Sequence, residues 1–312
     1  MDEWPDFKGK HILSGKQFNK MEIERVMAVA EDFRNELKTR PSLHLCPGNV
    51  LGTLFFEPST RTRLSFESAM LRLGGSVVGF AEAGTSSSAK GETLQDTIRT
   101  VCQYTDVIAM RHPRIGSAAE AAEVASVPIL NGGDGAGQHP TQALLDMLTI
   151  KTEKGTLEDL TVALVGDLKH GRTVHALVEL LKHYHTRLLF VAPPALAMPT
   201  EIATELVARG IAIEETDSLN AALQQADVVY MTRIQKERFV DPTEYERLKD
   251  AFVLTRAMVD AGKPGLTILH PLPRVSEITT DVDSFSGAAY FRQVQNGMYA
   301  RMALIALVLG RI

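Results

Sequence analysis

Near residue 60, hydroxyl and guanidinium side chains come directly after a predicted strand. They belong to Ser59, Thr60, Arg61 and Thr62. The run lies between an apolar stretch over 52–56, long enough for a buried strand, and a helical pattern that begins near Phe66. Ser59 and Thr60 favour a helix N-cap, and the N-terminus of a helix offers free backbone N–H groups at the positive end of its dipole. The spacing therefore predicts an anion site that suits a phosphate group.

Other polar residues follow later predicted strands in the same way. Those that could hold an anion or polarise a carbonyl group are Arg111, His139, Gln142, Arg172, Arg233, Gln235 and Arg274, while Arg63 stands beside the first cluster. In a parallel α/β sheet these ends lie along one edge, which is where ligands bind. The sequence therefore predicts a binding site rich in arginine.

The sequence offers little for covalent, metal or redox chemistry. It has no G-x-S-x-G motif and no metal-ligand spacing, and Cys46 and Cys102 lie outside the strand-end loops. Gly166 and Gly171 do not complete a G-x-G-x-x-G fingerprint, which disfavours a nicotinamide dinucleotide. We expect no cofactor and no metal. The residues favour small polyanionic substrates that react directly, with catalysis by proximity and by stabilisation of developing negative charge.

A loop over 84–91 reads G-T-S-S-S-A-K-G. Its composition is typical of a flexible surface loop, and on the residues alone this interpretation is favoured. The alternative is a lid that carries Lys90 and one or more serines to an anion.

Strands and helices alternate along the chain, which predicts parallel sheets covered by helices on both faces. Lys154-Gly155 separates two such series. The predicted fold class is α/β, with two doubly wound parallel-sheet domains and the active site in the cleft between them. The first domain is expected to span 1–148 plus 293–312, and the second 149–292. Within the first, a strand over 127–130 is expected to give way to a glycine-rich loop over 131–137.

Bulk composition is that of an ordinary globular protein. The chain has 312 residues, of which 45% are hydrophobic and 23% charged, and its net charge is -5. This charge gives no general attraction to nucleic acid or to a membrane surface. The apolar run over 302–309 is too short to span a bilayer, and two cysteines without a disulfide pattern fit a reducing compartment. We expect a cytoplasmic protein.

Six motifs stand in a fixed order: F-F-E-P-S-T-R-T-R-L-S-F-E, M-R-H-P, Q-H-P-T-Q, G-D-L-K-H-G-R-T, M-T-R-I-Q-K-E-R and H-P-L-P-R. With them the sequence resembles, from end to end, the aspartate branch of the aspartate/ornithine carbamoyltransferase family. The resemblance implies that carbamoyl phosphate and L-aspartate give N-carbamoyl-L-aspartate and phosphate, the committed step of de novo pyrimidine biosynthesis. It also implies that the first domain binds carbamoyl phosphate and the second binds aspartate.

The resemblance assigns roles to matching residues. Carbamoyl phosphate would be bound by Ser59, Thr60, Arg61, Thr62, Arg111, His139, Gln142 and the carbonyl groups of Pro271 and Leu272. Thr62, Arg111 and His139 would contact the carbamoyl oxygen, and Gln142 the carbamoyl NH2 group. Ser86 and Lys90 would reach the phosphate from the neighbouring subunit of a homotrimer, which reverses the reading of 84–91 as an ordinary loop. Ser87 and Ser88 are alternatives to Ser86.

L-Aspartate would be bound by Arg172, Arg233 and Gln235, with Lys90 also in reach. Glu57 would pair with Arg172 and Arg238 when the domains close. No general base is evident, so a leaving phosphate oxygen would take the proton of the amine. The sequence leaves open whether regulatory chains join the trimer.

Two other functions remain open at this stage. The ornithine branch of the family shares S-T-R-T and H-P-T-Q, but it carries cysteine where Pro271 stands here and an S-M-G motif where Arg233, Ile234 and Gln235 stand here. An arginine at that place suits a dicarboxylate and repels a cationic side chain. The other alternative is a catalytically silent anion-binding homologue.

Overall fold

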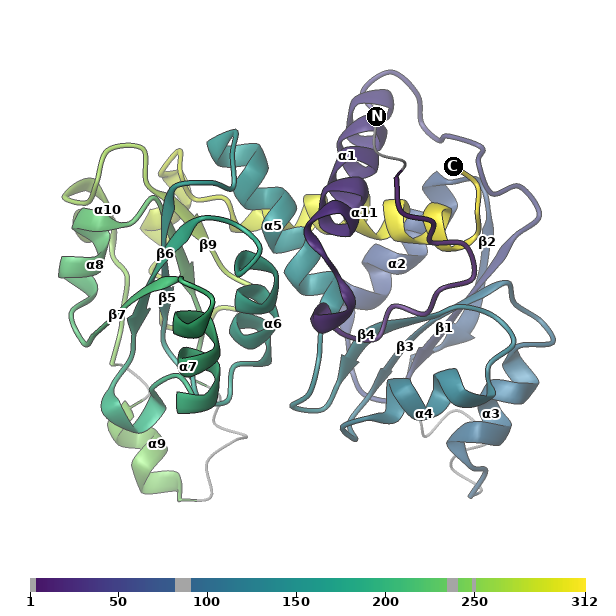
Figure 1. The fold of residues 1–312 in the computed structure, drawn as a ribbon, viewed down its shortest axis with the longest axis horizontal. Coiled ribbons are helices and arrows are strands. Elements are labelled where there is room, and N and C mark those ends of the chain that lie inside the picture. Colours follow the sequence, from purple (N-terminus) through teal and green to yellow (C-terminus); the bar gives the residue numbers. More distant parts are fainter. Residues whose placement is uncertain (1–3, 82–90, 235–240, 249–250) are drawn as a thin grey trace. The chain divides into compact units, whose positions relative to one another are not determined.

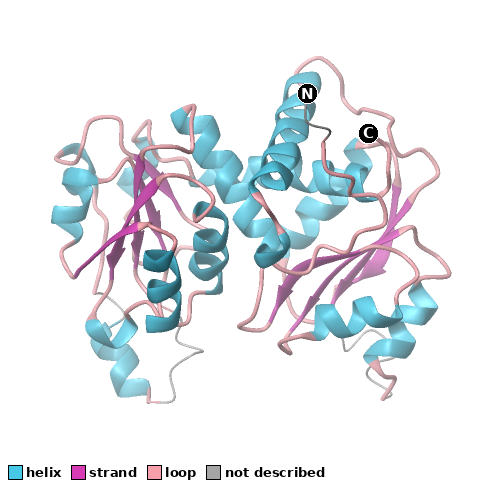
Figure 2. Cartoon of the chain, in the orientation of Figure 1, coloured by secondary structure: helices cyan, strands magenta, loops and turns pink. Residues whose placement is uncertain are grey.

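The computed structural model describes residues 4–81, 91–234, 241–248 and 251–312. Contacts divide the chain into two compact units, Met1–Leu148 with Val294–Ile312 (unit 1) and Thr149–Gln293 (unit 2). Each is an α/β unit with one parallel sheet (Figures 1 and 2). The predicted fold class is confirmed as two parallel-sheet α/β domains.

The sheet of unit 1 has the strand order β2-β1-β3-β4, and all its neighbours are parallel. Its strands are β1 (Val50–Phe55), β2 (Ser76–Phe80), β3 (Val107–His112) and β4 (Ile129–Asp134). Its helices are α1 (Lys20–Glu36), α2 (Thr60–Arg72), α3 (Leu94–Val101) and α4 (Ser117–Val124), after a short 3-10 turn η1 (Gly15–Gln17). The outer edge of β4 is continued by an isolated parallel bridge between Leu130 and Ile12.

Helices cover both faces of this sheet (Figure 1). On one face α3 and α4 pack against apolar residues of β1, β3 and β4, among them the buried Leu54, Ile108 and Ile129. The other face is covered by α1, α2 and parts of α5 (Pro140–Lys154) and α11 (Tyr290–Val308). Alternation of strand and helix in sequence thus produces the expected covered parallel sheet.

Unit 2 has the strand order β7-β6-β5-β8-β9, again all parallel. Its strands are β5 (Leu160–Val165), β6 (Thr186–Val191), β7 (Ala212–Thr216), β8 (Val228–Met231) and β9 (Thr267–Leu269). Its helices are α6 (Arg172–Leu181), α7 (Thr200–Ala208), α8 (Leu219–Gln225), α9 (Pro242–Leu248) and α10 (Arg256–Asp260), with 3-10 turns η4 (Pro194–Leu196) and η6 (Thr280–Ser284). A bridge between Ile268 and Ala288 continues the outer edge of β9.

The core of unit 2 forms on the strands β5, β6 and β8, which are almost wholly apolar. Val165, Leu189 and Val229 are fully buried with Leu223 of α8 and Val259 of α10. The face opposite to α8 and α10 is covered by α6 and α7 (Figure 1).

One predicted strand was too short, and another strand was not predicted. The strand predicted over 127–130 extends as β4 to Asp134, so the first half of the predicted glycine-rich loop is strand. The strand β7 was not predicted, because its sequence Ala-Ile-Glu-Glu-Thr has two exposed glutamates and only one half-buried apolar residue. An edge strand of this kind lacks the apolar alternation on which sequence reading depends.

Candidate anion-binding site

Each unit places several of its candidate residues where the strand order reverses. In unit 1, β2 and β3 lie on opposite sides of β1, so the strand order reverses between β1 and β3. In unit 2, β6 and β8 lie on opposite sides of β5, so the order reverses between β5 and β8. Ligands of open α/β sheets bind outside the carboxyl ends of the two strands that flank such a reversal. Arg111 lies at the end of β3, and Arg233 follows β8 by two residues.

The turn after β1 leads directly into the N-terminus of α2. Ser59 is the N-cap of α2 and has extended backbone, but its side chain makes no capping hydrogen bond. Ser59 is half-buried, Thr60 and Arg61 are exposed, and Thr62 is buried. The cap prediction therefore holds for the backbone only. The hydroxyl group of Ser59 is not used by the helix, and the first-turn N–H groups have no partner within the helix itself. Both suit an anion.

Arg111 is paired within unit 1. Its Nε donates to Oε1 of Glu57 at 2.6 Å, and both side chains are largely buried. The backbone supports this contact, because Arg111 stands opposite Phe55 and its carbonyl accepts from the N–H of Phe56 at 2.9 Å. Glu57 thus has a partner that the sequence reading did not anticipate.

The start of α2 lies against the ends of β3 and β4. A Cβ atom at Gly132 would stand 3.3 Å from Cγ2 of Thr62 and 3.1 Å from the carbonyl oxygen of Met110. Glycine at 132 therefore permits this close approach. As a result Thr62 and the strand end that carries Arg111 belong to one region of unit 1.

The loop between β4 and α5 is held by two buried polar side chains. Asn131 Oδ1 accepts from the N–H of Gly133 at 2.8 Å, and Asp134 Oδ1 accepts from the N–H of Gln138 at 2.6 Å. The next residue, His139, is 3% exposed, and its carbonyl accepts from the N–H of Gln142 at 3.0 Å. This loop fixes where α5 begins and so positions both His139 and Gln142.

Gln142 is held from the helix interior. Its Nε2 donates to Oδ1 of Asp146 at 2.9 Å, and Asp146 is fully buried. Arg301 of α11 donates to the hydroxyl groups of Ser65 at 2.9 Å and Thr141 at 3.2 Å. Burial lowers the pKa of Arg301 to about 10, against the opposing effect of Asp146. Arg301 therefore remains a cation near neutral pH and ties α2 to the start of α5.

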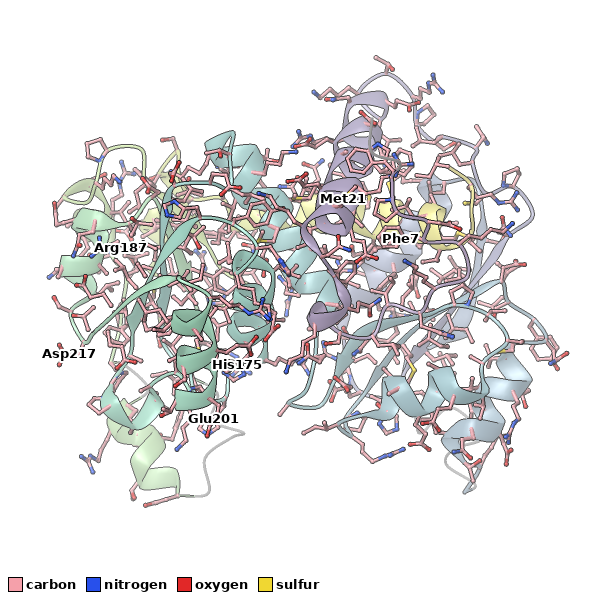
Figure 3. All side chains as sticks on the ribbon, viewed as in Figure 1. Phe7, Met21, His175, Arg187, Glu201 and Asp217 are labelled. Carbon is pink, nitrogen blue, oxygen red and sulfur yellow. The ribbon has the colours of Figure 1, made fainter. Side chains whose placement is uncertain are left out.

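In unit 2 a compact loop delivers Arg172 to the first turn of α6. Fully buried Asp167 accepts from the N–H of His170 at 3.0 Å. His175, labelled in Figure 3, contacts the carbonyl oxygen of Leu168 through Nε2 at 2.7 Å. Because a carbonyl oxygen only accepts, the Nε2–H group of His175 donates this bond, and burial lowers the pKa of the ring. Arg172 is half-buried.

The ends of β5 and β8 are joined by Thr232. Its hydroxyl group donates to the carbonyl oxygen of Val165 at 2.9 Å and accepts from the N–H of Asp167 at 3.2 Å. Gly166 has a φ of +115°, and a Cβ there would stand 2.4 Å from the carbonyl oxygen of Thr232, so no other residue fits. Arg233 follows directly and is half-buried.

Pro271 and Leu272 follow β9 in the same unit and are half-buried. The peptide bond between Leu272 and Pro273 is cis. Both carbonyl groups lie on the loop that follows β9, the edge strand that pairs with β8. Ser86, Ser87, Ser88, Lys90, Gln235 and Arg238 lie outside the described residues.

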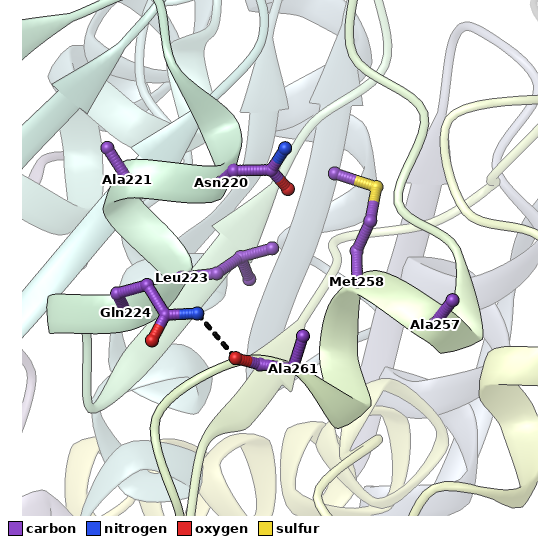
Figure 4. Close-up of a pocket in the computed structure, with 7 residues that line it drawn as sticks. All are labelled: Asn220, Ala221, Leu223, Gln224, Ala257, Met258 and Ala261. Atoms are coloured by element: carbon purple, nitrogen blue, oxygen red, sulfur yellow. Dashed lines mark hydrogen bonds between the residues drawn. The ribbon is translucent and has the colours of Figure 1, made fainter.

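Other features of the described residues offer no competing site. A surface pocket of about 500 Å³ lies between α8 and α10 and is lined mainly by apolar atoms, with Gln224 donating to the carbonyl group of Ala261 beside it (Figure 4). It contains none of the candidate residues. The described part of the chain holds no cluster of side chains that could bind a metal ion. None of its helices is long and apolar enough to cross a membrane.

Sequence reading missed the residues that support the site. Asp146 and Thr232 stand four residues and one residue from a predicted site residue, yet only the fold shows which group each one holds. Arg301 gave a signal, since it is the one charged residue between Arg292 and Arg311. Its partners Ser65 and Thr141 are too distant in sequence to be read from it.

Two parallel α/β units with arginines and helix N-termini at their strand reversals define a class of enzymes that bind small anionic substrates. Family models match both parts of the chain: aspartate/ornithine carbamoyltransferase, carbamoyl-P binding domain, over 10–152, and its Asp/Orn binding domain over 158–308. The chain belongs to the aspartate/ornithine carbamoyltransferase family.

Relatives from the aspartate branch cover nearly the whole chain. It is 52% identical to the aspartate carbamoyltransferase catalytic subunit of Thermococcus gammatolerans over 98% of this chain and 99% of that one. Aspartate transcarbamoylase from Trypanosoma cruzi, solved with carbamoyl aspartate and phosphate, is 44% identical with a TM-score of 0.92, over 99% of this chain and 100% of that one. The catalytic subunit from M. jannaschii is 47% identical with a TM-score of 0.90, over 96% of this chain and 97% of that one.

Proposed function

We propose that this protein transfers the carbamoyl group of carbamoyl phosphate to L-aspartate, giving N-carbamoyl-L-aspartate and phosphate, the committed step of pyrimidine biosynthesis. The observation that supports this most is the placement of arginines at the strand reversal of both units. One unit then serves a phosphate and the other a dicarboxylate. We further propose that residues 1–148 with 293–312 form the carbamoyl-phosphate-binding domain and 149–292 the aspartate-binding domain.

In the proposed chemistry, Ser59, Thr60, Arg61 and the helix N-terminus hold the phosphate. Thr62, Arg111 and His139 donate to the carbamoyl oxygen, Gln142 accepts from the carbamoyl NH2 group, and the carbonyl groups of Pro271 and Leu272 accept from the amino groups. Arg172, Arg233 and Gln235 bind the two carboxylates of aspartate.

The reaction forms one carbon–nitrogen bond, breaks one carbon–oxygen bond and moves one proton from nitrogen to a phosphate oxygen. The amine of aspartate attacks the carbamoyl carbon, negative charge develops on the carbamoyl oxygen, and the bond from carbon to the phosphate oxygen then breaks. Donors fixed at the oxygen contribute about 2.7–4 kcal/mol each to transition-state stabilisation. The departing phosphate takes the proton of the amine, so no side chain has to act as a base.

The proposed active unit is a cytoplasmic homotrimer. Ser86 and Lys90, with Ser87 and Ser88 as alternatives to the serine, reach the phosphate of a neighbouring subunit, and Lys90 also lies within reach of aspartate. Glu57 exchanges its pairing with Arg111 for Arg172 and Arg238 when both substrates are bound. Mixing a Lys90→Gln variant with an Arg61→Ala variant tests the shared site, because mixed trimers regain activity only if two chains build it.

The substrate is tested by assaying carbamoyl transfer to L-aspartate and to L-ornithine side by side. Product from aspartate alone is expected, since Arg233 favours a second carboxylate. Product from ornithine alone would assign the chain to the other branch of the family. Product from neither amine would contradict the proposal and favour a binding protein.

A further inference from the structure

His270 stands directly after β9 and before the Pro271–Leu272 carbonyl groups. Its ring is 1% exposed and makes two short contacts. The backbone N–H of Leu272 donates to Nδ1 at 2.7 Å, and Nε2 lies 2.7 Å from Oε1 of Glu277. A nitrogen that accepts from an N–H group carries no proton, so Nδ1 is bare and Nε2–H donates to the carboxylate.

Glu277 is equipped to hold this tautomer. It is 5% exposed, and its second oxygen, Oε2, accepts from the N–H groups of Val275 at 3.0 Å and Ser276 at 3.1 Å. Burial on its own raises the pKa of Glu277, but the bonds from His270 and the backbone outweigh it and leave the pKa below its ordinary value. With an imidazole N–H group on one oxygen and two backbone N–H groups on the other, the buried carboxylate acts as a fixed acceptor.

The bond to Nδ1 controls an unusual backbone conformation. Leu272 has a φ of +55°, a left-handed value that side chains with a Cβ rarely adopt. Such a conformation persists only where its surroundings impose it. The ring of His270 holds the Leu272 N–H, while the N–H of His270 itself donates to Oε1 of Gln293 at 2.9 Å. Both ends of the Pro271 segment are thereby fixed.

We propose that His270 is a positioning residue whose Nε2–H tautomer, set by Glu277, directs the carbonyl groups of Pro271 and Leu272 toward the amino groups of the substrates. The proposal rests on the function given above. A proton on Nδ1 would face the Leu272 N–H and break their bond, so the peptide that carries these carbonyl groups would turn. Misplacement of a contact by about 1 Å costs about 100-fold in rate.

Two substitutions separate positioning from mere packing. Asparagine reaches the place of Nδ1 and supplies an acceptor there, whereas glutamine reaches the place of Nε2 and leaves the Leu272 N–H without one. We expect His270→Gln to raise KM for carbamoyl phosphate and lower kcat, together by about 10- to 100-fold. His270→Asn should keep kcat/KM within about threefold, because it restores the acceptor. KM for L-aspartate should change least in both.

NMR spectra of the imidazole-15N-labelled trimer provide a readout that does not depend on activity. A ring with a bare Nδ1 and a protonated Nε2, changed to a mixture by Glu277→Gln, is the expected result. Equal kinetic losses in the asparagine and glutamine variants, or a proton on Nδ1 in the wild type, would overturn the proposal. If the wild type transfers no carbamoyl group, the proposed function fails, and the NMR result still decides whether the tautomer is fixed.

Discussion

In both sheets the two strands at the reversal are linked by the same pair of hydrogen bonds at their amino ends. At their carboxyl ends the links differ between the sheets. In unit 1 the N–H of Asp106 donates to Val50 O at 2.9 Å, and the N–H of Val50 donates to Asp106 Oδ2 at 2.7 Å. In unit 2 Asp227 and Thr161 exchange the same two bonds, at 2.8 and 2.9 Å. Each aspartate directly precedes the second strand of the reversal.

The carboxyl ends use different chemistry. Unit 1 joins them with the ion pair of Arg111 and Glu57, whereas unit 2 joins them with the neutral hydroxyl group of Thr232. An ion pair can be exchanged for an anionic ligand, but a buried hydroxyl bonded to backbone cannot. The amino ends of the two sheets are therefore alike, while their carboxyl ends differ in a way that suits the different ligands proposed for the two units.

The largest effect is expected at the carboxyl end of β3. Arg111→Ala removes one of the donors proposed for the carbamoyl oxygen and should lower kcat by about 10²- to 10³-fold. Steady-state kinetics with saturating substrates measure it. Arg114→Ala is the matched control, because Arg114 is three residues away and pairs with Glu120 at the surface. A loss of similar size in the control would assign the effect to the local fold.

A smaller and more selective effect is expected in unit 2. Arg233→Ala leaves a bound carboxylate without its charge partner, which costs at least about 2 kcal/mol, or about 30-fold in KM for L-aspartate. KM for carbamoyl phosphate should change little. The control is Arg187→Ala, at the amino end of β6 and labelled in Figure 3. Parallel increases in both KM values would contradict the division of labour between the units.

Unfolding experiments test whether the hydrogen bonds of Asp106 and Asp227 at the amino ends contribute equally to stability. Asp106→Ala and Asp227→Ala each leave a backbone N–H without its acceptor, and each should lower the free energy of unfolding by about 1–3 kcal/mol. Urea unfolding measures the loss, and kcat should be unchanged. If one variant were neutral and the other strongly destabilised, the two ends would not be equivalent.

The smallest effect is expected in the pH dependence of the ion pair between Asp227 and Lys263. Burial raises the pKa of Asp227, but hydrogen bonds from Lys263 and Thr161 outweigh it and leave the pKa below its ordinary value of 3.8. Its stabilising charge is therefore present above about pH 4 and is lost as the pH falls through the lowered value. Lys263→Gln should cost a few tenths of a kcal/mol at pH 7 and less at pH 3, since the ion pair is partly exposed. A stability loss that grew as the pH fell would contradict this prediction.

Features that depend on neighbouring residues in the chain could be predicted from the sequence. Contacts between residues far apart in the sequence could not. The strand-turn-helix around Ser59 and the arginines behind strands could be predicted, because turn residues and apolar runs act locally. The supports could not. Arg301 meets Ser65 across 236 positions, and nothing in the sequence relates Asp227 to Thr161. Such contacts follow from topology, since strand order decides which distant residues become neighbours.

The two glutamates that hid β7 from sequence prediction have a consequence for the folded molecule. Glu214 and Glu215 are exposed on the outermost strand of unit 2. A strand edge offers open backbone groups to any other strand, and exposed charged side chains disfavour such pairing, here Glu215 and the ion pair of Glu214 with Arg187. β7 therefore resists strand-to-strand aggregation, and it does so with the same residues that make it look least like a strand.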